Sequence, residues 1–102
     1  MNAQTAHKLN MYKAIESVFT LHASKWNFFP GLRGAFSRFA LKVAQIDLLA
    51  NDLRHEANDD KLVHLIHETD QLLLTCMDQR IHLLQQEQQE FYTDYLSARA
   101  IG

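Results

Sequence analysis

Six histidines in 102 residues are the side chains of this sequence best suited to carry chemistry. An imidazole changes its charge near neutral pH and is the commonest metal ligand in proteins. His64 and His67 lie three positions apart, so on a helix they would share one surface and supply two ligands of a metal site. A metal-binding helical bundle is therefore one hypothesis, beside the simpler interpretation that both are surface histidines.

His22 differs from these two because it lies in an apolar stripe, between Phe19 and Trp26. Such a position is typical of a core histidine whose ring nitrogens bond to neighbouring groups. The segment 21–25, Leu-His-Ala-Ser-Lys, also resembles the histidine phosphotransfer motif, in which a helical His is followed three positions later by a Lys. The resemblance implies that His22 would carry the phosphoryl group and that Lys25 would offset its charge. Trp26 stands where that family has a Gly.

Other reactive groups are few. Cys76 is the single cysteine, which excludes an internal disulfide and a four-cysteine zinc site. It falls in an apolar helical pattern, as a buried and inert thiol would. The sequence contains neither a nucleophile-elbow motif nor a Gly-rich phosphate loop. We therefore predict that the protein is not an enzyme and uses no cofactor.

The elements that would position these residues are helices. Three Gly and one Pro argue against a turn-rich β fold, and an apolar content of 47% argues against disorder. Apolar side chains recur at alternating spacings of three and four, which is the helical repeat. We predict a single all-α domain over residues 1–102, with helices at about 4–29, 32–57 and 60–100. The predicted stripes are Tyr12, Ile15, Phe19, His22, Trp26 and Phe29 in the first helix, Leu32, Phe36, Phe39, Val43, Ile46, Ala50 and Leu53 in the second, and Leu62, Ile66, Thr69, Leu73 and Met77, continued by Leu74, Met77, Ile81, Leu84, Gln88, Phe91 and Tyr95, in the third.

The three predicted helices are unequal in length. At 1.5 Å per residue the third would be about 60 Å long, against about 39 Å for each of the others. Its end would then carry apolar side chains without a partner in the same chain, to be covered by a second chain or by a bend that folds the helix back. We favour an antiparallel helical hairpin plus a long third helix, assembled as a homodimeric or higher helical bundle.

An aromatic cluster at the Pro30 corner is a second candidate surface. Its side chains would either plug the end of the bundle or contact a partner protein or an anionic membrane surface. Together with residues of the third helix, the predicted interaction surface is Trp26, Phe28, Phe29, Leu84, Phe91, Tyr92 and Tyr95.

The distribution of charge is more informative than its total. A net charge of −2 offers no electrostatic footprint for nucleic acid. Residues 1–50 carry a net charge of +4 and residues 51–102 a net charge of −6, which favours packing of the halves within one chain or between two. No apolar run approaches the roughly 20 residues of a transmembrane helix, and the amino end lacks a signal-peptide pattern. We expect a cytoplasmic protein.

Several short features run through the chain in a fixed order: Lys-Leu-Asn-Met-Tyr at 8–12, a Trp and then a Pro, an apolar segment at 36–53, and an Asp-Asp-Lys helix start. Together they resemble a set of uncharacterised small helical proteins of bacteria, over roughly residues 8–75. The resemblance implies a helical bundle and no known activity. We therefore predict a non-enzymatic interaction or scaffold protein that acts as a homo-oligomer, with histidine phosphotransfer or metal binding as the alternatives.

Overall fold

Helices account for nearly all of the structure, a computed structural model that describes residues 3–52 and 59–101, without the side chain of Asp59. In chain order these are α1 (Ala3–Leu21), α2 (Ala23–Trp26), α3 (Pro30–Ala50), α4 (Asp59–Asp78), the 3-10 turn η2 (Gln79–His82) and α5 (Gln85–Arg99). The described residues contain no strand, which confirms the predicted all-α class. Within this part of the chain, none of the helices combines the length and the hydropathy that a membrane span requires.

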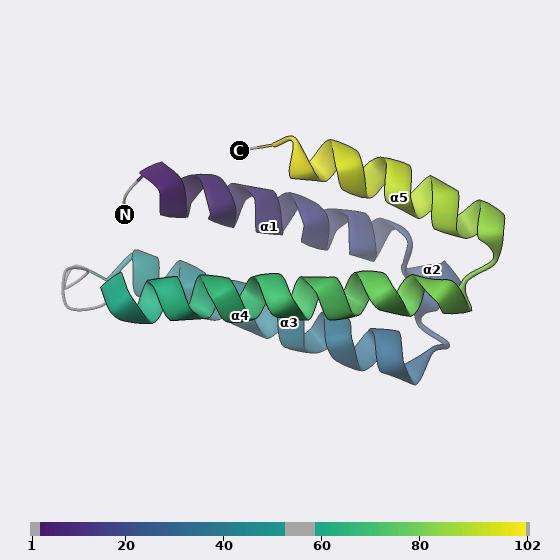
Figure 1. The fold of residues 1–102 in the computed structure, drawn as a ribbon, viewed down its shortest axis with the longest axis horizontal. Helices are drawn as coiled ribbons and strands as arrows, with labels where there is room; N and C mark the ends of the chain where they lie inside the picture. Colours follow the sequence, from purple (N-terminus) through teal and green to yellow (C-terminus); the bar gives the residue numbers. More distant parts are fainter. Residues whose placement is uncertain (1–2, 53–58, 102) are drawn as a thin grey trace.

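α1 is the element around which the others are arranged. It packs against α3 and α5, and α3 packs against α4. Figure 1 shows the four long helices running alternately in opposite directions, with α5 and α1 side by side above the α3–α4 pair. The Pro30 corner and η2 therefore lie at one end of the molecule, while the starts of α1 and α4 lie at the other.

Aromatic rings fill the core at the Pro30 end of the bundle. The ring of Phe19 lies 4.9 Å from that of Phe36 and 4.9 Å from that of Phe91, and Trp26 packs edge-on against Phe36 at 5.3 Å. Each such pair contributes about 0.5–1.5 kcal/mol beyond the burial of its area. The described residues of the predicted stripes of the first two helices are buried or half-buried, as is the opening stripe of α4 from Leu62 to Met77. The predicted continuation of that stripe is wrong at Leu74, Ile81 and Leu84, which are exposed because the helix is interrupted at η2.

The single helix predicted over 4–29 is divided at His22. The indole N–H of Trp26 donates to the carbonyl oxygen of Phe19 at 2.9 Å, and in a continuous helix that oxygen would accept from the backbone of Ala23. α1 therefore ends at Leu21 and the short α2 follows at an angle. The second predicted helix, 32–57, corresponds to α3, which begins at Pro30 and ends at Ala50, so the predicted helix is too long at Asn51 and Asp52. Residues 53–57 lie outside the described residues.

The single long helix predicted over 60–100 is also divided, by η2 and two extended residues, Leu83 and Leu84. The side chain of Arg80 donates to the carbonyl oxygen of Met77, and the side chain of Gln88 donates to that of Leu83, so a carbonyl oxygen on each side of the break has a side-chain donor. No side-chain hydrogen bond caps the start of α5 at Leu84. α5 then folds back onto α1. A continuous helix of about 60 Å does not occur, and it is α1 that covers the apolar face of α5.

Gly31 lies against the side chain of Gln79 in η2. A Cβ atom added at Gly31 would lie 2.9 Å from Oε1 of Gln79, so the end of this flexible side chain would have to move aside. The neighbouring rings of Phe29 and His82 stack with centroids 5.8 Å apart. The Pro30 corner thus packs directly on η2.

A partly buried polar junction joins α1 to α4. The hydroxyl of Tyr12 donates to Oδ1 of Asp70 at 2.5 Å, and Nζ of Lys8 lies 3.1 Å from Oδ2 of the same carboxylate. Burial and the neighbouring carboxylate raise the pKa of Tyr12 far above its ordinary value near 10.

We expect Tyr12→Phe to lower the free energy of unfolding by about 1–2 kcal/mol at pH 7, because Asp70 loses a donor. The pKa of Tyr12 is higher in the folded chain, so its stabilisation is complete below about pH 10 and is lost as the pH rises above that value. The difference between wild type and Tyr12→Phe in urea denaturation should therefore shrink between pH 9 and pH 11. Tyr92→Phe, whose hydroxyl takes no part in this junction, is the control. A difference that stays constant or widens would contradict this assignment.

Candidate functional site

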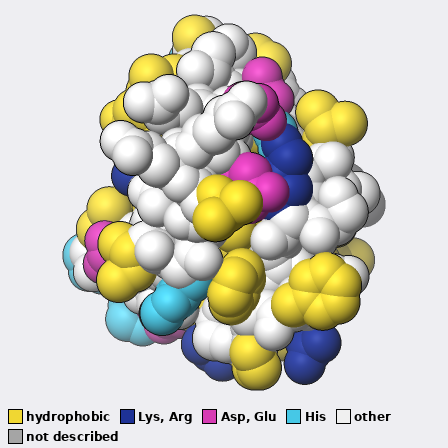
Figure 2. All heavy atoms as spheres, turned by 90° about the vertical axis from the view of Figure 1, so that its right-hand side faces the viewer, with side chains coloured by type: hydrophobic (Ala, Val, Ile, Leu, Met, Phe, Trp, Pro, Cys, Tyr) yellow, Lys and Arg dark blue, Asp and Glu magenta, His cyan; other side chains and the backbone are white. Residues whose placement is uncertain are grey.

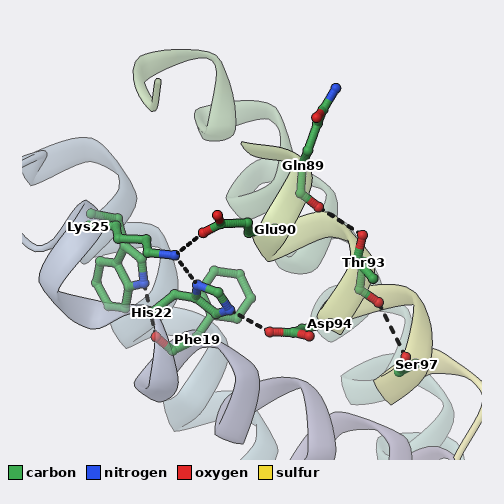
Figure 3. A network of polar contacts seen from close by, with 9 residues as sticks. Phe19, His22, Lys25, Gln89, Glu90, Thr93, Asp94 and Ser97 are labelled. Carbon is green, nitrogen blue, oxygen red and sulfur yellow. Dashed lines mark hydrogen bonds and ion pairs between the residues drawn. The ribbon is translucent and has the colours of Figure 1, made fainter. Parts of the chain in front are cut away.

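His22 lies at the turn between α1 and α2, with its side chain only 7% exposed. Its Nε2 is 2.7 Å from Oδ2 of Asp94 on α5, and its Nδ1 is 3.2 Å from Nζ of Lys25 (Figure 3). An ammonium group only donates, so Nδ1 accepts from Lys25, and Nε2 carries the proton that is donated to Asp94. Both nitrogens of the imidazole are therefore engaged.

Lys25 extends this network to a second carboxylate on α5. Its Nζ lies 2.7 Å from Oε2 of Glu90, and this hydrogen bond holds the pKa of Glu90 below its ordinary value. Phe91 lies between Glu90 and Asp94 in the sequence of α5. Its ring packs edge-on against that of His22, with the ring centroids 5.4 Å apart. The network therefore clamps α5 to the α1–α2 turn around one buried aromatic ring, and we call these five residues, His22, Lys25, Glu90, Phe91 and Asp94, the α5 clamp.

The phosphotransfer hypothesis requires a ring nitrogen with a lone pair facing an incoming phosphoryl group. Lys25 does lie beside His22, as the motif implies, but it occupies the lone pair of Nδ1. Nε2 points at the carboxylate of Asp94, whose negative charge repels a phosphodonor. The geometry favours a structural clamp over a phosphoryl carrier.

His64 and His67 are both exposed on α4. Nε2 of His64 lies 2.7 Å from Oε1 of Glu68, and Oε2 of that carboxylate is 2.7 Å from Nζ of Lys42. The hydrogen bond from Lys42 lowers the pKa of Glu68. In residues 3–52 and 59–101, no three His, Cys, Asp or Glu side chains lie close enough together to hold a metal ion.

Cys76 is fully buried in α4 and unpaired with another cysteine. Burial raises the pKa of its thiol to about 12, so the nucleophilic thiolate is scarce at neutral pH. This agrees with the expectation of a buried and inert thiol.

Three residues of the predicted interaction surface lie in the core. Trp26, Phe91 and Tyr95 are each about as buried as the central leucines, because α5 folds back over α1. They are not accessible to a second chain while α5 remains in place. Of the apolar residues at the end of the third segment, on which the expected dimer depended, Phe91 and Tyr95 are thus covered within the chain, whereas Leu84, Tyr92 and Leu96 remain exposed.

The remaining predicted residues lie at or near the end of the molecule. Phe28 is 80% exposed and Leu84 is 71% exposed, while Phe29 is half-buried against His82. Tyr92 is partly covered by the guanidinium of Arg80, 4.4 Å from its ring centre. Figure 2 views this end and shows separate hydrophobic side chains among polar ones, with Lys and Arg at the lower edge.

A surface that the sequence analysis did not single out lies between α3 and α4. Two leucines of α3 are strongly exposed there, Leu41 at 59% and Leu48 at 78%. Beside Leu41 and Leu72 is a hollow of about 470 Å³, and beside Leu48 and Leu65 is one of about 340 Å³. We call this surface the outer groove; it is formed by Arg38, Leu41, Lys42, Gln45, Leu48 and Leu49 of α3, by Asp52 just after α3, and by Leu65, His67, Glu68, Gln71 and Leu72 of α4.

A signal for this groove is present in the sequence. Positions 38, 41, 45, 48 and 52 follow the same alternating spacing as the buried stripe of α3, on another side of the helix. The buried aromatic stripe is by itself enough to explain an amphipathic helix, so the sequence pattern does not single out this second stripe.

A third hollow, of about 460 Å³, lies between α1 and α5. Small side chains such as Ala14, Ser17 and Ala98 line it, together with the exposed Leu21. Among the described residues that line it, the one charged group is Asp94, which already accepts from His22. This hollow therefore presents no group poised for catalysis.

Replacing Asp94 by Ala leaves the buried Nε2–H of His22 without its acceptor. We expect this to lower the free energy of unfolding by about 1–3 kcal/mol. Because the contact joins α5 to the α1–α2 turn, amide hydrogen exchange should accelerate more in α5 than in α3. Asp78→Ala, which removes an exposed acid at the end of α4, is the control and should leave exchange in α5 unchanged. Equal exchange in the two variants would rule out the α5 clamp.

Comparison with protein-family models gives no match for this chain, and comparisons with curated proteins and with solved structures give no significant match. What the chain does is therefore inferred from the geometry of its own residues.

Proposed function

We propose that this chain is a non-enzymatic helical interaction protein that acts as a homo-oligomer and binds through the outer groove. The observation that carries the proposal is the exposure of Leu41 and Leu48 beside two apolar hollows. Each leucine that becomes fully buried contributes about 1.5–3 kcal/mol. A groove that leaves both in water therefore favours a bound partner.

The spacing of these leucines suits a helical partner. They lie seven residues apart, or about 10.5 Å along α3, which is two turns of the helix. An amphipathic helix laid in a groove presents its anchor side chains at the same interval. At the Pro30 end of the molecule, the exposed side chains are instead Phe28, Ile81 and Leu84. They lie on two turns and do not share a helical repeat.

The chemistry of the described residues supports a binding role over catalysis. The thiol of Cys76 is buried and its pKa is raised, and the ring of His22 is engaged at both nitrogens. The groove itself is lined mainly by leucines and by the paired side chains of Lys42 and Glu68. Such a surface orients a partner and does not polarise a substrate.

Sedimentation equilibrium at tens of micromolar tests this proposal. We expect the wild type to have the mass of a dimer or a larger oligomer, and Leu48→Glu to be monomeric, because the substitution places a charge in the buried interface. Phe28→Glu is a matched control, since Phe28 and Leu48 are almost equally exposed, at 80% and 78%. It should retain the wild-type mass. Circular dichroism should show unchanged helicity in both variants.

A wild-type protein that is monomeric at these concentrations would overturn the proposal. So would loss of assembly in Phe28→Glu with assembly retained in Leu48→Glu, since this would place the interface at the Pro30 end.

A further inference from the structure

We propose that the occupant of the outer groove is α3 of a second copy of this chain, lying antiparallel to the first across a two-fold axis near Gln45. This inference rests on the proposed function and specifies the partner and its orientation. It is carried by the arrangement of charge and of apolar side chains about Gln45.

Charges of opposite sign lie at equal sequence separations on either side of Gln45. Arg38 precedes it by seven residues, about 10.5 Å along α3, and Asp52 follows it by seven, two residues beyond the end of α3 at Ala50. Both line the outer groove, one at each end. A surface with this property is complementary to itself when one copy is turned through 180°.

The antiparallel orientation pairs these charges favourably. Arg38 of one copy then lies beside Asp52 of the partner subunit, and the same pair occurs again at the other end. A parallel two-fold pairing would place Arg38 beside Arg38 and Asp52 beside Asp52, which like-charge repulsion opposes. Lys42 is already held by Glu68 at 2.7 Å, so Arg38 extends the basic end of the groove beyond that pair.

The leucines fit the same axis. Leu41 precedes Gln45 by four residues and Leu48 follows it by three. In the antiparallel pair, Leu48 of each copy approaches the hollow beside Leu41 and Leu72, and Leu41 approaches the hollow beside Leu48 and Leu65. Each subunit thus offers two apolar side chains and two apolar hollows to receive those of its partner.

Reversal of the two charges tests the orientation. Arg38→Asp and Asp52→Arg, made singly, should each raise the dissociation constant of the dimer about tenfold, because each turns two attractive contacts into repulsive ones. The double variant restores opposite charges at both ends and should return to within about threefold of wild type. Measurement is by sedimentation equilibrium at low salt, where surface charges are least screened. A double variant weakened by the product of the two single effects would overturn the inference.

Oxidative cross-linking tests the position of the axis. Gln45→Cys should form a disulfide-linked dimer, because residue 45 of each copy faces its own counterpart there. Ser37→Cys, an exposed position of α3 outside the groove, is the control and should not cross-link. The buried Cys76 can remain in both variants, since its thiol is inaccessible.

The outcomes separate this inference from the proposed function. A wild-type dimer that neither cross-links at residue 45 nor responds to the charge reversals would retain the proposed function and refute the antiparallel pairing. A wild-type monomer would refute both.

Discussion

Phe91 of α5 lies edge to face on Phe19 of α1, with ring centres 4.9 Å apart, and is almost completely buried. The turn at residues 79–84 gives up backbone hydrogen bonds that a continuous helix would make, each worth about 0.5–1.5 kcal/mol net. Burial of one Phe side chain contributes about 1.5–3 kcal/mol, and its pairing with another ring adds to this. α5 buries few other side chains, mainly Tyr95 and Ala98. The path of the last quarter of the chain therefore depends on the site that α1 provides for Phe91.

This one contact also decides which surfaces remain open. Because α5 packs on α1, its buried side chains Phe91, Tyr95 and Ala98 are covered within the chain. The α3–α4 pair has no such cover over Leu41 and Leu48. The docking of α5 on α1 thus determines which apolar surface stays exposed, and this surface lies over the α3–α4 pair.

The opposite charges of the two halves of the sequence meet within the chain. Within the described residues, they are joined by the pairs Lys8–Asp70, Lys25–Glu90 and Lys42–Glu68. All these side chains are partly exposed, so each pair contributes little to stability. Their effect is on specificity, since they favour the register in which basic α1, α2 and α3 face acidic α4 and α5.

Periodicity alone was enough to predict the helical class, the buried stripe from Tyr12 to Phe19 and the corner at Pro30, because these depend on residues close together in the chain. The division of the third helix could not be predicted in this way. Residues 79–84 contain neither Gly nor Pro, and the free energy that favours a turn there comes from the burial of Phe91 against α1, more than 70 positions earlier. The pairing of His22 with Asp94 could not be predicted from local spacing for the same reason, since Asp94 becomes its neighbour only when α5 folds back. Local spacing determines which face of a helix is apolar, whereas the tertiary structure decides which of those faces is covered, because only long-range packing brings distant side chains together.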